Sequence, residues 1–422
     1  MNKRIETVIV GGGQAGMATS YHLARRGREH VVVERAVQAA NVWRNDRWDS
    51  FTLVTPNWSF RLPGAEYQGD APEGYLKRDE IVSRLEQYIT AFDLPIEYGV
   101  HINTIERRLE TQDYIVSSEG ATWEARNVVV ATGLFQRPRR PSFGTDIAAD
   151  FSQLYSGQYR HPDMLPPGAV LVVGSAQSGC QIAEELYQSG RRVYLCVGGA
   201  GRVPRRYRGK DIFEWLLLTG FLDRTAGQLP SPKARFEGNP HATGKGGGHT
   251  INLHQFARDG VVLLGRLQSA TDGTIWLAGD LKQNLTKADR FEANITQMID
   301  GYIDRTGRDA PPELLPVLRD GYDAQEISDL DLRRAGITTI IWAMGYTFDF
   351  GLVKLPVCDS YGYPIQQRSA TEYPGLYFIG LPWLSKLKSG LFLGVGEDAD
   401  SVASAIAGDA KHDATFTRPA GG

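Results

Sequence analysis

The sequence lacks the features that would place a protein of this length in several large classes. It has only three cysteines in 422 residues, Cys180, Cys196 and Cys358, and their wide spacing forms neither a disulfide framework nor a Cys-x-x-Cys or metal motif. No apolar run approaches the roughly 18 to 20 residues of a membrane span. The short apolar run near the N-terminus is too brief for a signal peptide. We therefore expect a cytoplasmic protein with no membrane partner and no metal.

An excess of charge of one sign is also missing. Lys and Arg number 46 against 49 Asp and Glu, which gives a net charge of −3, so the composition provides no general attraction to nucleic acid. The apolar fraction of 42% and charged fraction of 23% are ordinary for a globular protein, and the length predicts two or three domains. Glycine is abundant, with 47 residues, which indicates tight turns and close approaches of the backbone to a ligand.

The chain opens with a predicted strand, glycine-rich turn, helix and second strand. Residues 7–10 form an apolar run typical of a buried strand, and a G-x-G-x-x-G motif follows it. The glycines of such a motif allow a tight turn and close approach to a pyrophosphate, which the N-terminus of the next helix attracts. An acid at the end of the second strand accepts hydrogen bonds from a ribose. This unit predicts a dinucleotide site made by Gly11, Gly13, Gln14, Ala15, Gly16, Glu34 and Arg35.

A second copy of the pattern follows a proline-rich connector. A strand over 170–173 leads into a glycine-containing turn over 174–179, a helix to about Ser189 and a further strand over 193–197. Ala176 replaces the middle glycine, and no acid ends the second strand. The lack of an acid at this position and the arginines that follow the strand favour binding of the 2′-phosphate of NADPH. The alternative is that these arginines form a solvated basic loop. The residues predicted to bind in this copy are Gly174, Ser175, Gln177, Ser178, Arg202 and Arg205.

Two dinucleotide folds in one chain imply two dinucleotides, with hydride passing from a nicotinamide to a flavin. Later strands over 337–341 and 376–379, and a last helix over about 398–407, return the chain to its first sheet. We therefore predict an α/β fold with two Rossmann-like dinucleotide-binding domains. The NADPH domain, about 161–324, is inserted into a discontinuous FAD domain, 1–160 plus 325–422.

The motifs occur in an order that resembles a known family. The first turn with Glu34, Ala131-Thr132-Gly133, the second turn, Trp342-Ala343-Met344-Gly345-Tyr346 and Leu376-Tyr377-Phe378-Ile379-Gly380 follow one another along nearly the whole chain. This pattern is similar to the flavin-containing monooxygenase-like family, in its bacterial branch. The resemblance implies FAD and NADPH as cofactors, and a flavin C4a-hydroperoxide, formed with molecular oxygen, that oxygenates a small nitrogen- or sulfur-bearing substrate. It is also compatible with a homodimer.

The resemblance implies further site residues outside the two turns. Trp43, Arg44 and Trp48 lie where the family places residues around FAD, with Arg44 or Arg47 against the pyrophosphate. A packed aromatic loop with surface arginines is the alternative interpretation. Asn57 lies where an amide would approach the flavin, and it is the catalytic candidate. The remaining predicted cofactor residues are Thr132, Gly133, Gly345, Gly380 and Gly394.

One segment departs from the family pattern. Phe151 and Tyr155 occupy positions where a family signature before the second turn often has Gly and His. The change disfavours Baeyer–Villiger chemistry and keeps two alternatives open: an NADPH oxidase or reductase that does not oxygenate, and a non-enzymatic FAD-binding accessory protein. A dithiol reductase of the thioredoxin-reductase type is disfavoured because no cysteine pair lies between the turns.

Overall fold

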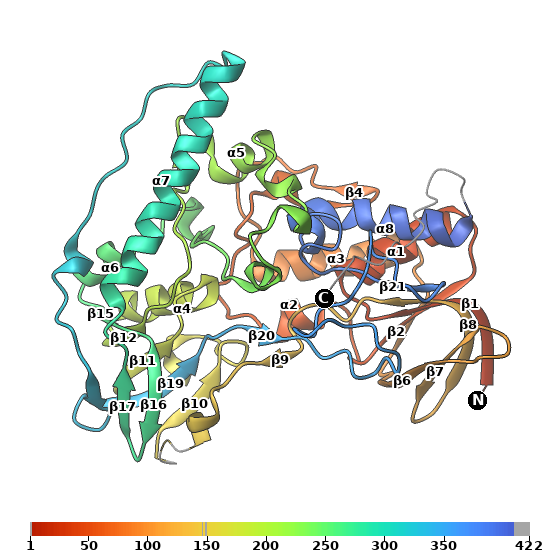
Figure 1. Cartoon of the computed structure of the whole chain (residues 1–422), viewed down its shortest axis with the longest axis horizontal. Helices are drawn as coiled ribbons and strands as arrows, with labels where there is room; N and C mark the ends of the chain where they lie inside the picture. Colours follow the sequence, from red (N-terminus) through yellow and green to blue (C-terminus); the bar gives the residue numbers. More distant parts are fainter. Residues whose placement is uncertain (1, 146, 148–149, 409–422) are drawn as a thin grey trace.

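The computed structural model describes residues 2–145, 147 and 150–408. Two sheets lie side by side along the long axis of the molecule, each with helices packed against it (Figure 1). The chain passes between them twice, and the two crossing segments pair as the antiparallel strands β9 (Arg137–Pro138) and β20 (Tyr346–Thr347). The structure confirms the predicted α/β class with two dinucleotide-binding domains, and the central strands of both sheets are parallel.

The first sheet is built around the opening strand. Its order is β5-β2-β1-β8-β7-β6, with β21 also paired to β8. On β1, Ile9 contributes to one hydrophobic cluster, whereas Val8 and Val10 contribute to another on the opposite face, as the two-residue period of a strand requires. The elements are β1 (Asn2–Val10), β2 (His30–Glu34), β5 (Ile96–Tyr98), β6 (Ile102–Arg107), β7 (Tyr114–Ser118), β8 (Thr122–Val130), β21 (Leu376–Phe378), α1 (Gln14–Arg25), α2 (Asn41–Asn45), α3 (Arg78–Ala91) and α8 (Phe392–Ala407).

The second sheet repeats this construction. Its five strands are all parallel in the order β10-β19-β11-β12-β15. A three-stranded sheet of β16, β17 and β18 shares a hydrophobic cluster with one face, and the long helix α7 flanks the molecule at one end (Figure 1). The elements are β10 (Ser152–Tyr155), β11 (Ala169–Val173), β12 (Val193–Cys196), β15 (Val262–Leu264), β16 (Leu267–Thr271), β17 (Thr274–Leu277), β18 (Asp329–Asp331), β19 (Ile337–Trp342), α4 (Gln177–Gln188), α5 (Ile212–Leu218), α6 (Leu253–Arg258) and α7 (Leu281–Thr306).

The second sheet reaches beyond the segment predicted for it. β10 and β19 lie in the ranges 1–160 and 325–422, yet both pair within the second sheet. A division that keeps each sheet whole therefore falls before Ser152 and after Trp342. Among the described helices, none is both long and apolar enough to cross a membrane.

Candidate functional site

Two glycines of the first turn, Gly11 and Gly16, could not be replaced by another residue without a clash. Gly11 has a φ of +114°, and a Cβ there would lie 2.5 Å from the carbonyl oxygen of Ala131. A Cβ on Gly16 would lie 1.9 Å from the carbonyl oxygen of Gly11, so the helix can pack this close to the strand only with glycine. Gly13 differs, because a Cβ there would meet nothing within 4 Å. The backbone at Gly13 therefore faces open space.

The N-terminus of α1 and the carboxylate of Glu34 meet at this turn. No side chain caps α1, so its first N–H groups are available to an anion. Glu34 accepts hydrogen bonds from the N–H groups of Gly12 at 2.7 Å and Ala36 at 2.8 Å. These bonds hold the carboxylate at the end of β2, where the sequence predicted an acceptor for ribose hydroxyls.

Both turns line a single cavity with a volume of about 1010 Å³. Twelve of the residues predicted from the sequence line it: Gly11, Gly13, Gln14, Ala15, Glu34, Arg35, Trp43, Thr132, Gly133, Gln177, Ser178 and Gly380. The open backbone at Gly13 and the uncapped α1 fit the pyrophosphate of FAD, and Glu34 fits its ribose. The uncapped N-terminus of α4 lies against the same space.

Of the two arginines that the sequence left open, Arg47 lies at the cavity. Its guanidinium carbon is 4.4 Å from the ring centroid of Phe135 and 5.3 Å from that of Trp43, and burial lowers the pKa of Arg47. Arg44 instead pairs with Glu86 at 2.6 Å and does not line the cavity. Figure 1 shows α2, which carries Trp43 and Arg44, lying between the two sheets.

Four predicted residues contribute to the structure around the cavity, and of these only Gly380 also lines it. Trp48 is buried and packs edge-on against Phe51 with centroids 5.1 Å apart. A Cβ on Gly380 would lie 2.6 Å from the Cβ of Ala15, and one on Gly394 would lie 2.4 Å from the carbonyl oxygen of Lys388. Both glycines therefore permit close packing. Gly345 has a φ of +79° and bends the chain after β19.

Asn57, the catalytic candidate, does not line the cavity. It is buried, and its Nδ2 donates a hydrogen bond to the carbonyl oxygen of Ala71 at 3.0 Å. Its Oδ1 is buried without a hydrogen-bond partner. The structure thus gives Asn57 a packing contact, and its catalytic role stays a prediction.

The second turn is shaped in the same way as the first. A Cβ on Gly174 would lie 2.5 Å from the carbonyl oxygen of Ala343, and one on Gly179 would lie 1.8 Å from that of Gly174. Ser175 is buried, and its Oγ accepts a hydrogen bond from the N–H of Gly198 at 2.9 Å. Gly174 and Ser175 therefore fix the turn, while Gln177 and Ser178 face the cavity.

A loop over residues 238–243, here called the cover loop, lies on the second turn. A Cβ on Gly238 would be 3.2 Å from the Cβ of Ala176. The side chain of Gln177 hydrogen-bonds to the backbone of Ala242 in both directions, and Nε2 of His241 donates to the carbonyl oxygen of Ser175. Burial lowers the pKa of His241 to about 4, so it is neutral near pH 7. The sequence predicted only an irregular segment here.

Arg202 and Arg205 do not act as free cations at the second turn. Arg202 pairs with Asp289 at 2.7 Å and Glu292 at 2.6 Å. Arg205 is 2% exposed, pairs with Asp211 and lies over the ring of Tyr75. Neither lines the cavity. Their assignment to a 2′-phosphate is therefore revised: both guanidinium groups are held by carboxylates of the protein.

A different cation lies at the end of β12. The side chain of Lys287, an exposed residue of α7, places its Cδ 3.8 Å from a Cβ built on Gly199. Gly199 follows β12 at the position that corresponds to Ala36 after β2, because the N–H groups of Gly11 and Gly174 donate to the equivalent residues Val33 and Cys196. Lys287 is far from the second turn in the sequence, so no local motif could have pointed to it.

Sequence comparison identifies a protein family and several oxidoreductases to which this chain is similar. A family model described as pyridine nucleotide-disulphide oxidoreductase matches residues 8–211. The uncharacterized oxidoreductase CzcO-like of Geobacillus kaustophilus is 32% identical over 404 residues, which cover 95% of this chain and 97% of that protein. The indole-3-pyruvate monooxygenase YUCCA1 of Oryza sativa subsp. japonica is 27% identical over 313 residues, covering 71% of this chain and 76% of that protein.

The fold is also shared with a solved structure. A flavin-containing monooxygenase from Stenotrophomonas maltophilia superposes with a TM-score of 0.64 and 18% sequence identity, covering 96% of this chain and 99% of that chain. At this identity the likeness establishes the common two-domain fold.

Proposed function

The chain belongs to the flavin-containing monooxygenase-like family of flavoprotein oxidoreductases, an enzyme family that uses FAD and NADPH, and on that premise we propose its reaction. We propose that it is an NADPH-dependent monooxygenase that oxygenates a small nitrogen- or sulfur-bearing molecule. The single cavity lined by both turns supports the reduction of FAD by NADPH, since hydride transfer requires the two cofactors to meet in one space. The similarity to monooxygenases supports the oxygenation.

The first sheet is proposed as the FAD domain and the second as the NADPH domain. The N-terminus of α1 would hold the FAD pyrophosphate, with Glu34 on the ribose and the guanidinium of Arg47 adding positive charge in the cavity. Bound FAD would accept hydride from NADPH and activate oxygen as the C4a-hydroperoxide that the family resemblance implies. The protein's own part is to position the two cofactors and to exclude water with apolar walls such as Leu53, Leu391 and Phe392.

Lys287 is proposed to select NADPH over NADH. The 2′-phosphate of a bound dinucleotide lies beyond the end of the second strand of its fold, and Lys287 is next to Gly199 at that end. No salt-bridge partner is found for Lys287 within the described part of the chain. An ammonium group at this place would pair with the phosphate.

The cysteines disfavour a dithiol relay as the path for electrons. Cys180 and Cys196 are buried, and burial raises the pKa of both thiols, which leaves them protonated and unreactive. None of the described residues that line the cavity is a cysteine. This supports the proposal that electrons from the flavin go to oxygen or to a small molecule rather than to a protein disulfide.

The test is the fate of oxygen during turnover. The holoenzyme would be given NADPH, oxygen and a panel of amines, thioethers and 2-oxo acids, while NADPH loss, peroxide release and product mass are followed. The expected result is a product that gains one atom from isotopically labelled oxygen for each NADPH consumed. Stoichiometric peroxide with every member of the panel would instead identify an NADPH oxidase, the alternative left open by Phe151 and Tyr155.

A further inference from the structure

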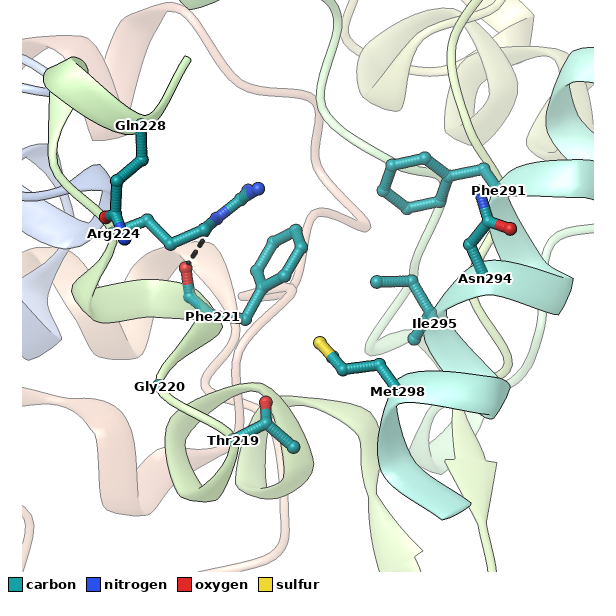
Figure 2. A pocket seen from close by; sticks show the side chains of 9 residues that line it. All are labelled: Thr219, Gly220, Phe221, Arg224, Gln228, Phe291, Asn294, Ile295 and Met298. Carbon is teal, nitrogen blue, oxygen red and sulfur yellow. Dashed lines mark hydrogen bonds between the residues drawn. The ribbon is translucent and has the colours of Figure 1, made fainter. Parts of the chain in front are cut away.

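A second cavity, with a volume of about 450 Å³, lies outside the cofactor space. One side is formed by the segment of η4 (Phe221–Asp223) and η5 (Ala226–Gln228), and the other by α7 (Figure 2). The ring of Phe221 lines this cavity and also the main one. The second cavity is therefore separated from the cofactor space by one aromatic wall, and it is large enough for a small organic molecule.

The walls of the second cavity are mainly apolar. Phe221 faces Phe291, Ile295 and Met298 of α7 across the space (Figure 2). Phe291 is fixed in place because its ring lies against the backbone of Gly201. Such walls favour an aromatic or alkyl group over a polar one.

Arg224 is the one charged residue in this lining. Figure 2 shows its guanidinium extending into the cavity, with Nε donating to the carbonyl oxygen of Phe221 at 3.1 Å. The guanidinium carbon lies 3.6 Å from the ring centroid of Phe221 and 5.7 Å from that of Trp383. Neither Nη atom has a hydrogen-bond or salt-bridge partner among the described residues.

The adjacent carboxylate does not neutralise Arg224. Asp223 pairs with Lys386 at 3.0 Å and with Lys388 at 3.1 Å, and these lysines also contact Glu397. Burial lowers the pKa of Arg224, and no carboxylate opposes that effect. Arginines such as Arg202 and Arg205 differ, because each is paired with at least one acid. A half-buried cation without a partner is costly, so an anion from outside the chain would stabilise it.

A carboxylate is the anion that these surroundings fit. The two Nη groups of arginine match a carboxylate in a two-point hydrogen bond. A phosphate would carry a second negative charge into a cavity with only one cation. We propose that Arg224 binds the carboxylate of the substrate, and that the nitrogen- or sulfur-bearing substrate is a carboxylic acid whose aryl or alkyl body lies along Phe221 toward the main cavity. This inference rests on the proposed function, since it names the substrate class of that oxygenase.

Binding without turnover tests the proposal independently of oxygenation. The FAD-loaded holoenzyme would be titrated calorimetrically with 3-phenylpropanoate and octanoate, and with the neutral amides of both acids. We expect each acid to bind at least about tenfold more tightly than its amide, because a hydrogen bond to a charged group is stronger than a neutral one. Equal affinities for acid and amide, or no detectable binding of either acid, would overturn the proposal.

Variants test whether the preference for acids over their amides depends on Arg224. Arg224→Met keeps the apolar stem, and it should reduce the affinity for both acids to that of their amides while FAD content and the KM for NADPH stay unchanged. Arg224→Lys keeps the charge and should retain part of the preference, which covers the case in which the Met variant does not fold. Arg290→Met, at an exposed arginine beside Phe291, should change nothing.

Two further outcomes are decisive. An equal loss of acid preference in Arg290→Met would show that the acids bind to surface charge, which overturns the proposal. A rise in the KM for NADPH in Arg224→Met as large as the loss of acid affinity would assign Arg224 to the nucleotide, which also overturns it. Peroxide release in place of oxygenation would refute the proposed function and leave the binding result standing.

Discussion

The two phosphate turns are made of the same parts and differ in what lies on top of them. At the first turn, the backbone of Gly13 faces open cavity. At the second, Ala176 stands in the same place and the cover loop lies on it, joined by hydrogen bonds to Ser175 and Gln177. The first turn thus offers close backbone contact to a cofactor that stays bound, and the second is covered by a segment that an exchanging cofactor would contact.

The two dinucleotide-binding units differ in the charge found at the end of their second strands, β2 and β12. β2 ends at Glu34, whose carboxylate is held by two backbone N–H groups. β12 is followed by Gly198 and Gly199, and the side chain of Lys287 lies next to Gly199, with its Cδ 3.8 Å from a Cβ built there. A carboxylate disfavours a 2′-phosphate and a cation favours it, so the proposed roles of Glu34 and Lys287 would distinguish FAD from NADPH by charge as well as by shape.

The largest expected effect comes from placing the same side chain at the middle position of each turn. Gly13→Asp should abolish FAD retention, because its carboxylate would occupy the space of the pyrophosphate. A Cβ at Gly13 meets no protein atom within 4 Å, so the variant should still fold. Ala176→Asp should purify with FAD and lose NADPH oxidation. The flavin absorbance of the purified proteins measures FAD retention in both variants, and the consumption of NADPH measures its oxidation by Ala176→Asp. A fully yellow Gly13→Asp protein would refute the first site.

A smaller effect tests whether the arginines after the second turn belong to the scaffold. Arg205→Ala leaves Asp211 buried without its partner, and the loss of one member of a buried pair costs about 3–5 kcal/mol. Urea unfolding should show this loss. Arg206→Ala is the matched control, since Arg206 is exposed and bonds only to loop carbonyls, and it should change stability by less than about 0.5 kcal/mol. Normal stability with a raised KM for NADPH would restore the original assignment of Arg205.

The turns could be predicted from the sequence because their constraints are local. Gly16 must be glycine owing to the carbonyl of Gly11, five residues earlier, and Gly179 owing to that of Gly174. Strand, turn and helix are consecutive in the chain, so the motif contains the whole geometry. The fold class follows from these two units, and so does the part of the cavity lining that includes Gly11, Gly13 and Gln177.

The rest of the site depends on contacts between distant segments. Lys287 reaches Gly199 from another element, and Gly238 reaches Ala176 across an irregular loop. Arg44 and Arg47 are three residues apart and of the same residue type, and only their contacts with Glu86 and Phe135 distinguish them. Nothing in the local sequence around Arg202 indicates that its guanidinium pairs with Asp289 and Glu292 of α7.

The third prediction concerns the charge at the end of β12. Lys287→Ala should raise the KM for NADPH about tenfold, because a charge-assisted hydrogen bond to the phosphate is lost, and leave the KM for NADH unchanged. Lys282→Ala is the control, as Lys282 is an exposed lysine near the start of the same helix. Equal changes with both nucleotides would mean that Lys287 contacts a part of the cofactor that they share.

The smallest effect is a pH dependence that only the second turn should have. His249 follows the cover loop, and its Nε2 lies 2.6 Å from Oε1 of Glu184 on α4. This hydrogen bond raises the pKa of His249 above its usual 6.5. A raised folded-state pKa stabilises the protein fully below pH 6.5, and the contribution is lost as the pH rises through the folded value.

The pair is partly exposed, with 44% of the His249 side chain accessible, so its contribution is at most about 1 kcal/mol. His249→Ala should therefore lower Tm by no more than about 4 °C at pH 6 and match the unmodified protein at pH 9. His161→Ala, at another exposed histidine, should show no such difference. If the Tm difference for His249→Ala is the same at both pH values, protonation of His249 does not hold this segment against α4, and the two turns differ only in shape and fixed charge.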